Sequence, residues 1–150
     1  MILDLRSNPG GLLNSVFQVA DAFIDSKLIV YEGDSKGNRK DWKAGRGGFA
    51  LDVPLVILTD KYSASASEVL AGALMDHNRA LVIGEKTFGK GSVNTMEKIS
   101  DGSGIYFTIA KWYTPNGQLI EGEGLTPDID ITQMSDLGND VDALDDAIEI

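Results

Sequence analysis

The chain has 150 residues, of which 43% are hydrophobic and 24% charged, a composition typical of one globular domain. Its net charge of −10 disfavours binding to nucleic acid and to anionic membrane surfaces, because both require a basic patch. The absence of cysteine excludes disulfide bonds, thiolate metal ligands and a cysteine nucleophile.

Apolar residues recur at intervals that predict alternating strands and helices. Strands are predicted at residues 2–5, 28–31, 39–44, 53–58, 80–84, 93–99, 105–113 and 118–120, and helices at 12–24, 65–77 and 140–150. Turn residues at 34–38 and 101–104 make the flanking strands hairpins. The order of strands and helices predicts an α/β layered fold with parallel strand pairs. No apolar stretch approaches the ~20 residues that a membrane-spanning helix needs.

The segment at residues 62–68, Tyr-Ser-Ala-Ser-Ala-Ser-Glu, joins a predicted buried strand to a predicted helix. Unpaired N–H groups and a partial positive charge at a helix start can stabilise an oxyanion that forms at a serine. Ser65 and Glu68, three residues apart, also fit a capping box, which explains both residue types without catalysis. The pattern alone leaves both interpretations open.

A serine nucleophile here needs a base other than histidine. The single histidine, His77, follows Ser65 on the same predicted helix, roughly 18 Å away along its axis. No Gly-x-Ser-x-Gly elbow is present. An uncharged lysine can act as base, and Lys90 stands between two glycines just after a predicted strand. The alternative is an ordinary exposed loop lysine.

Two other glycine-containing segments have functional interpretations. Residues 84–90 match most of a P-loop, but Gly91 replaces the magnesium-binding Ser or Thr. The residues that follow also lack the apolar spacing of the helix that a P-loop requires. Nucleotide binding is therefore a distant alternative. The turn at residues 8–11, Asn-Pro-Gly-Gly, could offer the N–H of Gly10 or Gly11 to an oxyanion, although a plain turn before a helix also explains it.

Five segments carry a family resemblance: residues 4–11 (DLRSNPGG), 63–74 (SASASEVLAGAL), 84–93 (GEKTFGKGSV), 113–117 (YTPNG) and 124–129 (GLTPDI). In this order and spacing they resemble the carboxyl-terminal (tail-specific) processing serine peptidases. The resemblance implies an α/β fold like that of the ClpP and crotonase group, a layered core with a mixed sheet, flanking helices and a β-hairpin. Residues 1–150 would then form a partial peptidase catalytic core.

The resemblance also implies a catalytic serine and lysine that act as a dyad. Ser65 would be the nucleophile and Lys90 its base, with the oxyanion held by the Ala66 amide and by a glycine, Gly10 or Gly11. The expected activity is endopeptidase cleavage of proteins near their carboxyl termini, on protein or peptide substrates with free C-termini. No metal or organic cofactor is expected, and the usual location of the family is periplasmic or otherwise extracytoplasmic.

The chain departs from the family pattern in two ways. The PDZ domain that normally precedes the core, the N-terminal elements and a signal peptide are not in this sequence, and the helix predicted at 140–150 reads as cut off by the chain end. Many members have Gln four residues after the lysine, where Asn94 would here orient the amine. Because of these departures, a non-catalytic, truncated peptidase-like domain stays an alternative. Surfaces that normally contact the missing domain could favour a homodimer.

Asp76 is another position that resembles an acidic residue of the family. It follows Ser65 by eleven residues, about 16 Å along a helix, which is too far for a direct catalytic role. We expect Asp76 to order the helix end through Arg79.

Overall fold

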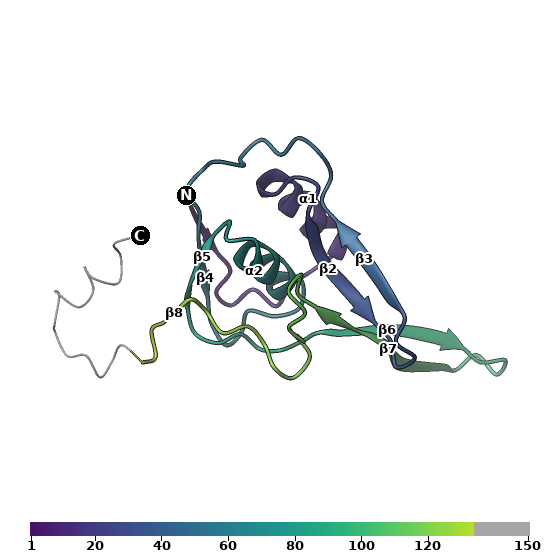
Figure 1. Cartoon of the computed structure of the whole chain (residues 1–150). Coiled ribbons are helices and arrows are strands. Elements are labelled where there is room, and N and C mark those ends of the chain that lie inside the picture. Colours follow the sequence, from purple (N-terminus) through teal and green to yellow (C-terminus); the bar gives the residue numbers. More distant parts are fainter. Residues whose placement is uncertain (134–150) are drawn as a thin grey trace.

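The computed structural model describes residues 1–133, which form two four-stranded sheets and two helices (Figure 1). The first sheet is parallel, in the order β1 (Ile2–Asp4), β4 (Val56–Thr59), β5 (Leu81–Gly84), β8 (Ile129–Asp130). The second is antiparallel, in the order β3 (Arg39–Lys43), β2 (Leu28–Gly33), β7 (Gly104–Tyr113), β6 (Ser92–Lys98). The helices are α1 (Leu13–Phe23) and α2 (Ala66–Asp76).

Helix α2 lies between the two sheets (Figure 1), where it contacts β5 on one side and β2 on the other and also packs against α1. Residues 66–74 of α2 are all buried, because sheet, helix and loops surround it. Gly72 permits one of these close approaches, since a Cβ at this position would lie 3.0 Å from the Thr114 side chain. The largest apolar side chains that are fully buried on and around α2 are Ile29, Val30, Ile57, Val69, Leu74, Val82, Ile120 and Leu125.

The predicted α/β layered fold is confirmed, with parallel pairing in one sheet and antiparallel pairing in the other. The strand predicted at 118–120 is wrong, because only an isolated bridge joins Leu119 to Tyr113. The short strand β8 escaped prediction, since two residues give no readable alternation. The helix predicted at 140–150 lies outside the described residues. Lys90 is followed by strand β6 and not by a helix, so the segment at 84–90 is not a P-loop.

The far part of the β6–β7 hairpin extends away from the body of the molecule (Figure 1). Strand β2 pairs only with residues 111–113 of β7, so the rest of β7 pairs with β6 alone. Large apolar side chains are exposed along this arm: Met96, Ile105, Tyr106, Phe107 and Ile109. Neither helix of residues 1–133 is long and apolar enough to cross a membrane.

Candidate active site

Ser65 sits at the turn between β4 and α2, with φ +57° and ψ −116°. A serine with positive φ is uncommon, and such backbone strain is concentrated at functional sites. Of the three serines of the motif, Ser63 donates its hydroxyl to Leu5 O at 2.8 Å and Ser67 to Asn8 O at 3.1 Å. The Ser65 hydroxyl donates to no acceptor within residues 1–133, so its proton is free to be taken by a base.

The turn at residues 8–11 presses directly against the Ser65 turn. A Cβ on Gly10, whose φ is +94°, would lie 2.7 Å from Ala64 O and 2.8 Å from Ala66 N, so only glycine fits here. Asn8 O accepts hydrogen bonds from Ala64 N at 3.0 Å and from the Ser67 hydroxyl. The family resemblance implies that these two turns meet at one site, and the structure brings them together.

Two backbone N–H groups at this junction could hold an oxyanion. Ala66 is the first residue of α2, so its N–H has no acceptor within the helix. The N–H of Gly10 donates to Asn8 Oδ1 at 3.0 Å and is therefore occupied. Between the two glycines, Gly11 is thus the better second donor.

Asp60 joins the same two turns through its carboxylate. It accepts hydrogen bonds from the N–H and hydroxyl of Ser7 and from the N–H groups of Tyr62 and Ser63. Partial burial acts to raise the pKa of Asp60, but the N–H groups of Ser7 and Tyr62 and the hydroxyls of Ser7 and Ser63 outweigh it. The pKa of Asp60 therefore lies below its usual range.

Asp60 is expected to make stability depend on pH in the acidic range. Its pKa is lower in the folded chain than the ~3.9 of an unfolded chain, so its stabilisation is complete above about pH 4 and is lost as pH falls through the folded pKa. Urea unfolding of the wild type and of Asp60→Asn from pH 2.5 to pH 7 measures the difference in unfolding free energy. This difference should shrink below about pH 4; a constant difference over the whole range would contradict the assignment.

Glu68 connects the serine turn to the loop that carries Lys90. Its side chain is fully buried in the first turn of α2. Oε2 accepts from Ser65 N and from Lys90 N, both at 2.8 Å, and Oε1 accepts from the Thr87 hydroxyl and from Gly89 N, both at 2.6 Å. The predicted capping box is present, and the same carboxylate also fixes the backbone of Lys90 relative to that of Ser65.

Replacing Glu68 with alanine should destabilise the chain by about 3 kcal/mol or more, because several buried donors lose their acceptor at once. Glu123→Ala, at an exposed position, is the matched control and should change the free energy of unfolding by less than about 0.5 kcal/mol. Chemical denaturation measures both variants. Equal, small losses for the two would show that Glu68 does not hold the loops.

Lys90 lies on the loop between β5 and β6, with an exposed side chain. Its Nζ makes no hydrogen bond with any residue in 1–133, and none joins it to Ser65. Lys90 and Ala64 nevertheless line one surface hollow, so the loop opens toward the serine turn. The neighbouring Gly91 N donates to Glu121 Oε2 at 2.7 Å, which holds the loop from its other side.

No hydrogen bond joins Asn94 to Lys90 among the described residues. Asn94 lies on β6, where its Oδ1 accepts from the Thr108 hydroxyl at 2.7 Å and its Nδ2 donates to Ser92 Oγ at 3.2 Å. Thr108 thus takes one of the two lone pairs of the Asn94 amide oxygen.

His77 and Asp76 lie at the far end of α2 from Ser65, as their sequence spacing predicts. His77 Nε2 is 2.7 Å from Leu28 O, and Asp76 Oδ2 accepts from Asn116 N at 2.7 Å. The expected partnership between Asp76 and Arg79 is wrong, because the Arg79 guanidinium donates to three main-chain carbonyls, those of Phe23, Ala50 and Val53. Asp76 instead fixes the turn that contains Asn116.

Sequence reasoning identified Glu68 only as a helix cap. Its contacts with Thr87, Gly89 and Lys90 join residues 19 to 22 positions apart, which no local pattern encodes. One signal was available: a glutamate at the start of a helix that is otherwise almost wholly apolar must be buried, and a buried carboxylate needs several donors. No group of three His, Asp or Glu residues within 1–133 could hold a metal ion.

Comparisons with known proteins agree on one family. The model of "Peptidase family S41" matches residues 1–131. A carboxyl-terminal-processing protease of Synechocystis sp. is 46% identical over 127 residues, which cover 85% of this chain and 30% of that protein. A carboxy-terminal-processing protease of Bartonella bacilliformis is 42% identical over 133 residues, which cover 88% of this chain and 31% of that protein.

A solved structure, the photosystem II D1 C-terminal processing protease, superposes with a TM-score of 0.81 at 44% identity. The superposition covers 86% of this chain and 33% of the other. The chain thus spans about 30% of the length of the curated relatives that it matches.

Proposed function

This chain belongs to peptidase family S41, and we propose that it is the catalytic core of a serine endopeptidase that cleaves proteins near their carboxyl termini. The observation that carries this proposal is the Ser65 hydroxyl, whose proton is donated to no acceptor within residues 1–133. Ser65 is held at positive φ at the start of α2, and Glu68 joins its backbone to that of Lys90. The relatives named as carboxyl-terminal-processing proteases support the same activity.

The proposed mechanism uses Ser65 as nucleophile and Lys90 as base. Lys90 in its uncharged form takes the proton from the Ser65 hydroxyl as Oγ attacks the peptide carbonyl, and the N–H groups of Ala66 and Gly11 hold the oxyanion. Lys90 then protonates the departing amine, and water releases the acyl group from Ser65. A rotation of the exposed Lys90 side chain toward Ser65 is required, which its freedom from other hydrogen bonds permits.

Asn94 stays a proposed orienting residue for Lys90. Its amide oxygen accepts from the Thr108 hydroxyl and has a second lone pair for the Lys90 amine. An extracytoplasmic location, which the family resemblance implies, and association into homodimers remain predictions.

Incubation of the purified chain with an unstructured protein, followed by mass mapping of the fragments, tests the proposed function. We expect a small set of cuts close to the carboxyl terminus of the substrate. Cuts spread evenly along the substrate would contradict the proposed specificity, and no cleavage by a folded chain would favour a non-catalytic domain.

A further inference from the structure

Three loops surround a hollow beside the serine turn. The hollow has a volume of about 420 Å³ and is lined by Ser7, Pro9, Tyr62, Ala64, Phe88 and Lys90. Lys90 is the one charged residue of this lining. The lining residues come from the turn before α1, from the serine turn and from the lysine loop, so the hollow lies where the elements of the candidate site converge.

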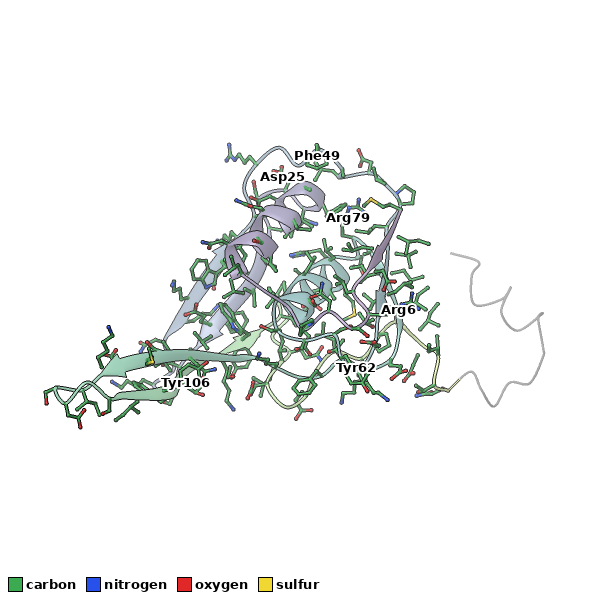
Figure 2. All side chains as sticks on the ribbon, turned by 180° about the vertical axis from the view of Figure 1, so that it is seen from behind. Arg6, Asp25, Phe49, Tyr62, Arg79 and Tyr106 are labelled. Carbon is green, nitrogen blue, oxygen red and sulfur yellow. The ribbon has the colours of Figure 1, made fainter. Side chains whose placement is uncertain are left out.

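Two aromatic side chains of the hollow are exposed although their backbones are fixed. The Tyr62 side chain is 59% exposed and that of Phe88 is 64% exposed. Tyr62 N donates to Asp60 Oδ1 at 2.9 Å, and Phe88 N donates to Ser63 O at 3.0 Å. Figure 2 shows the Tyr62 side chain on the outside of the body, on the same side as Arg6. Neither ring belongs to the buried core, so packing of the fold does not explain them.

The hollow is lined by the proposed base, Lys90, and by none of the residues proposed to hold the oxyanion. Gly10, Gly11 and Ala66 line a different hollow, against α1, which contains neither aromatic ring nor Lys90. Because the base hands its proton to the departing amine, the substrate residue that carries this amine must lie near Lys90.

We propose that this hollow binds the side chain of the first substrate residue on the leaving-group side of the cleaved bond, and that it selects apolar side chains of the size of leucine or phenylalanine. Tyr62 and Phe88 form its apolar walls. This proposal rests on the proposed function, because the leaving-group side is defined by the roles of Ser65 and Lys90.

The first test compares two peptides that are identical except for leucine or alanine directly after the mapped cleavage position. Wild type should cleave the leucine peptide about tenfold more efficiently in kcat/KM. Tyr62→Ala and Phe88→Ala should each bring this ratio down toward one. Phe49→Ala removes an aromatic ring that is 89% exposed and lies on the opposite side of the body in Figure 2, so it should keep the ratio. An active enzyme whose ratio is the same in all variants would overturn the proposal and leave the peptidase function standing.

The second test requires no turnover. Leucinamide and alaninamide, which mimic the departing residue, are titrated into ¹⁵N-labelled Ser65→Ala protein and followed by NMR. Leucinamide should shift the amide signals of Phe88 and Lys90 with an apparent Kd about tenfold lower than that of alaninamide, and adding Phe88→Ala should remove the difference. Equal affinities for the two amides, or shifts confined to other residues, would overturn the hollow as a binding site. Selective binding by a chain that cleaves nothing would instead count against the proposed function alone.

Discussion

Replacing Ser65 with alanine is expected to lower peptide-bond cleavage by at least about 10⁴-fold while the fold stays intact. The hydroxyl is the attacking group, and no other serine of the motif can replace it, because Ser63 and Ser67 donate their protons to Leu5 O and Asn8 O. The alanine side chain retains the Cβ and places no new atoms against Gly10. Turnover of a peptide with a mapped cleavage position, measured at saturating concentration, gives the change in kcat.

Ser67→Ala is the matched control for Ser65→Ala. It removes a hydroxyl two residues away that only supports the turn at Asn8, so cleavage should fall by less than about tenfold. Circular dichroism and the unfolding midpoint confirm that both variants are folded. If Ser65→Ala retains the wild-type rate, Ser65 is not the nucleophile, whatever the effect of Ser67→Ala.

Replacing Lys90 with methionine is expected to lower kcat by about 10³-fold or more, since the variant lacks the base that takes the Ser65 proton. Methionine keeps an unbranched side chain of similar reach. The exposed Lys90 side chain makes no hydrogen bond within residues 1–133, and only its backbone N–H is bound, to Glu68. The substitution should therefore leave the free energy of unfolding nearly unchanged, so that loss of activity reports on chemistry.

Lys86→Met provides the comparison for Lys90→Met. Lys86 is an exposed lysine of the same loop, four residues earlier, and it does not line the hollow beside Ser65. Cleavage by Lys86→Met should stay within about twofold of the wild type, because the variant removes the same charge without removing the base. Similar losses in Lys86→Met and Lys90→Met would show that net charge near the site matters and that Lys90 is no specific base.

Much of the fold could be predicted from the sequence, because the spacing of the apolar residues and the positions of the turn residues indicate the same strands and helices. The buried run before residue 60, the helix after Ser65 and the hairpin around residues 101–104 all occur within a few residues of the expected bounds. The exceptions have no local signal. Strand β8 consists of two residues that pair with β5, and residues 118–120 resemble a strand only because two apolar residues adjoin a turn.

The positions of Ser65 and Lys90 on their turns followed from motif resemblance, whereas the groups that hold those turns did not. Glu68 and Asp60 act between segments far apart in sequence: Asp60 binds Ser7, and Glu68 binds the N–H of Lys90. Hydrogen bonds of this kind depend on how α2 and the loops meet in three dimensions. For the same reason the hydrogen-bond partners of Asn94 and Arg79 could not be predicted: Asn94 Oδ1 accepts from the Thr108 hydroxyl, and the Arg79 guanidinium donates to main-chain carbonyls.

Reaction with an active-site-directed fluorophosphonate, followed by mass mapping of the labelled peptide, tests the central role of Ser65 most directly. We expect one label per chain, on Ser65, with labelling slowed strongly in Lys90→Met and absent in Ser65→Ala. Labelling of a different serine, or labelling of Ser65 at the same rate with and without the Lys90 amine, would contradict the proposed Ser65–Lys90 dyad.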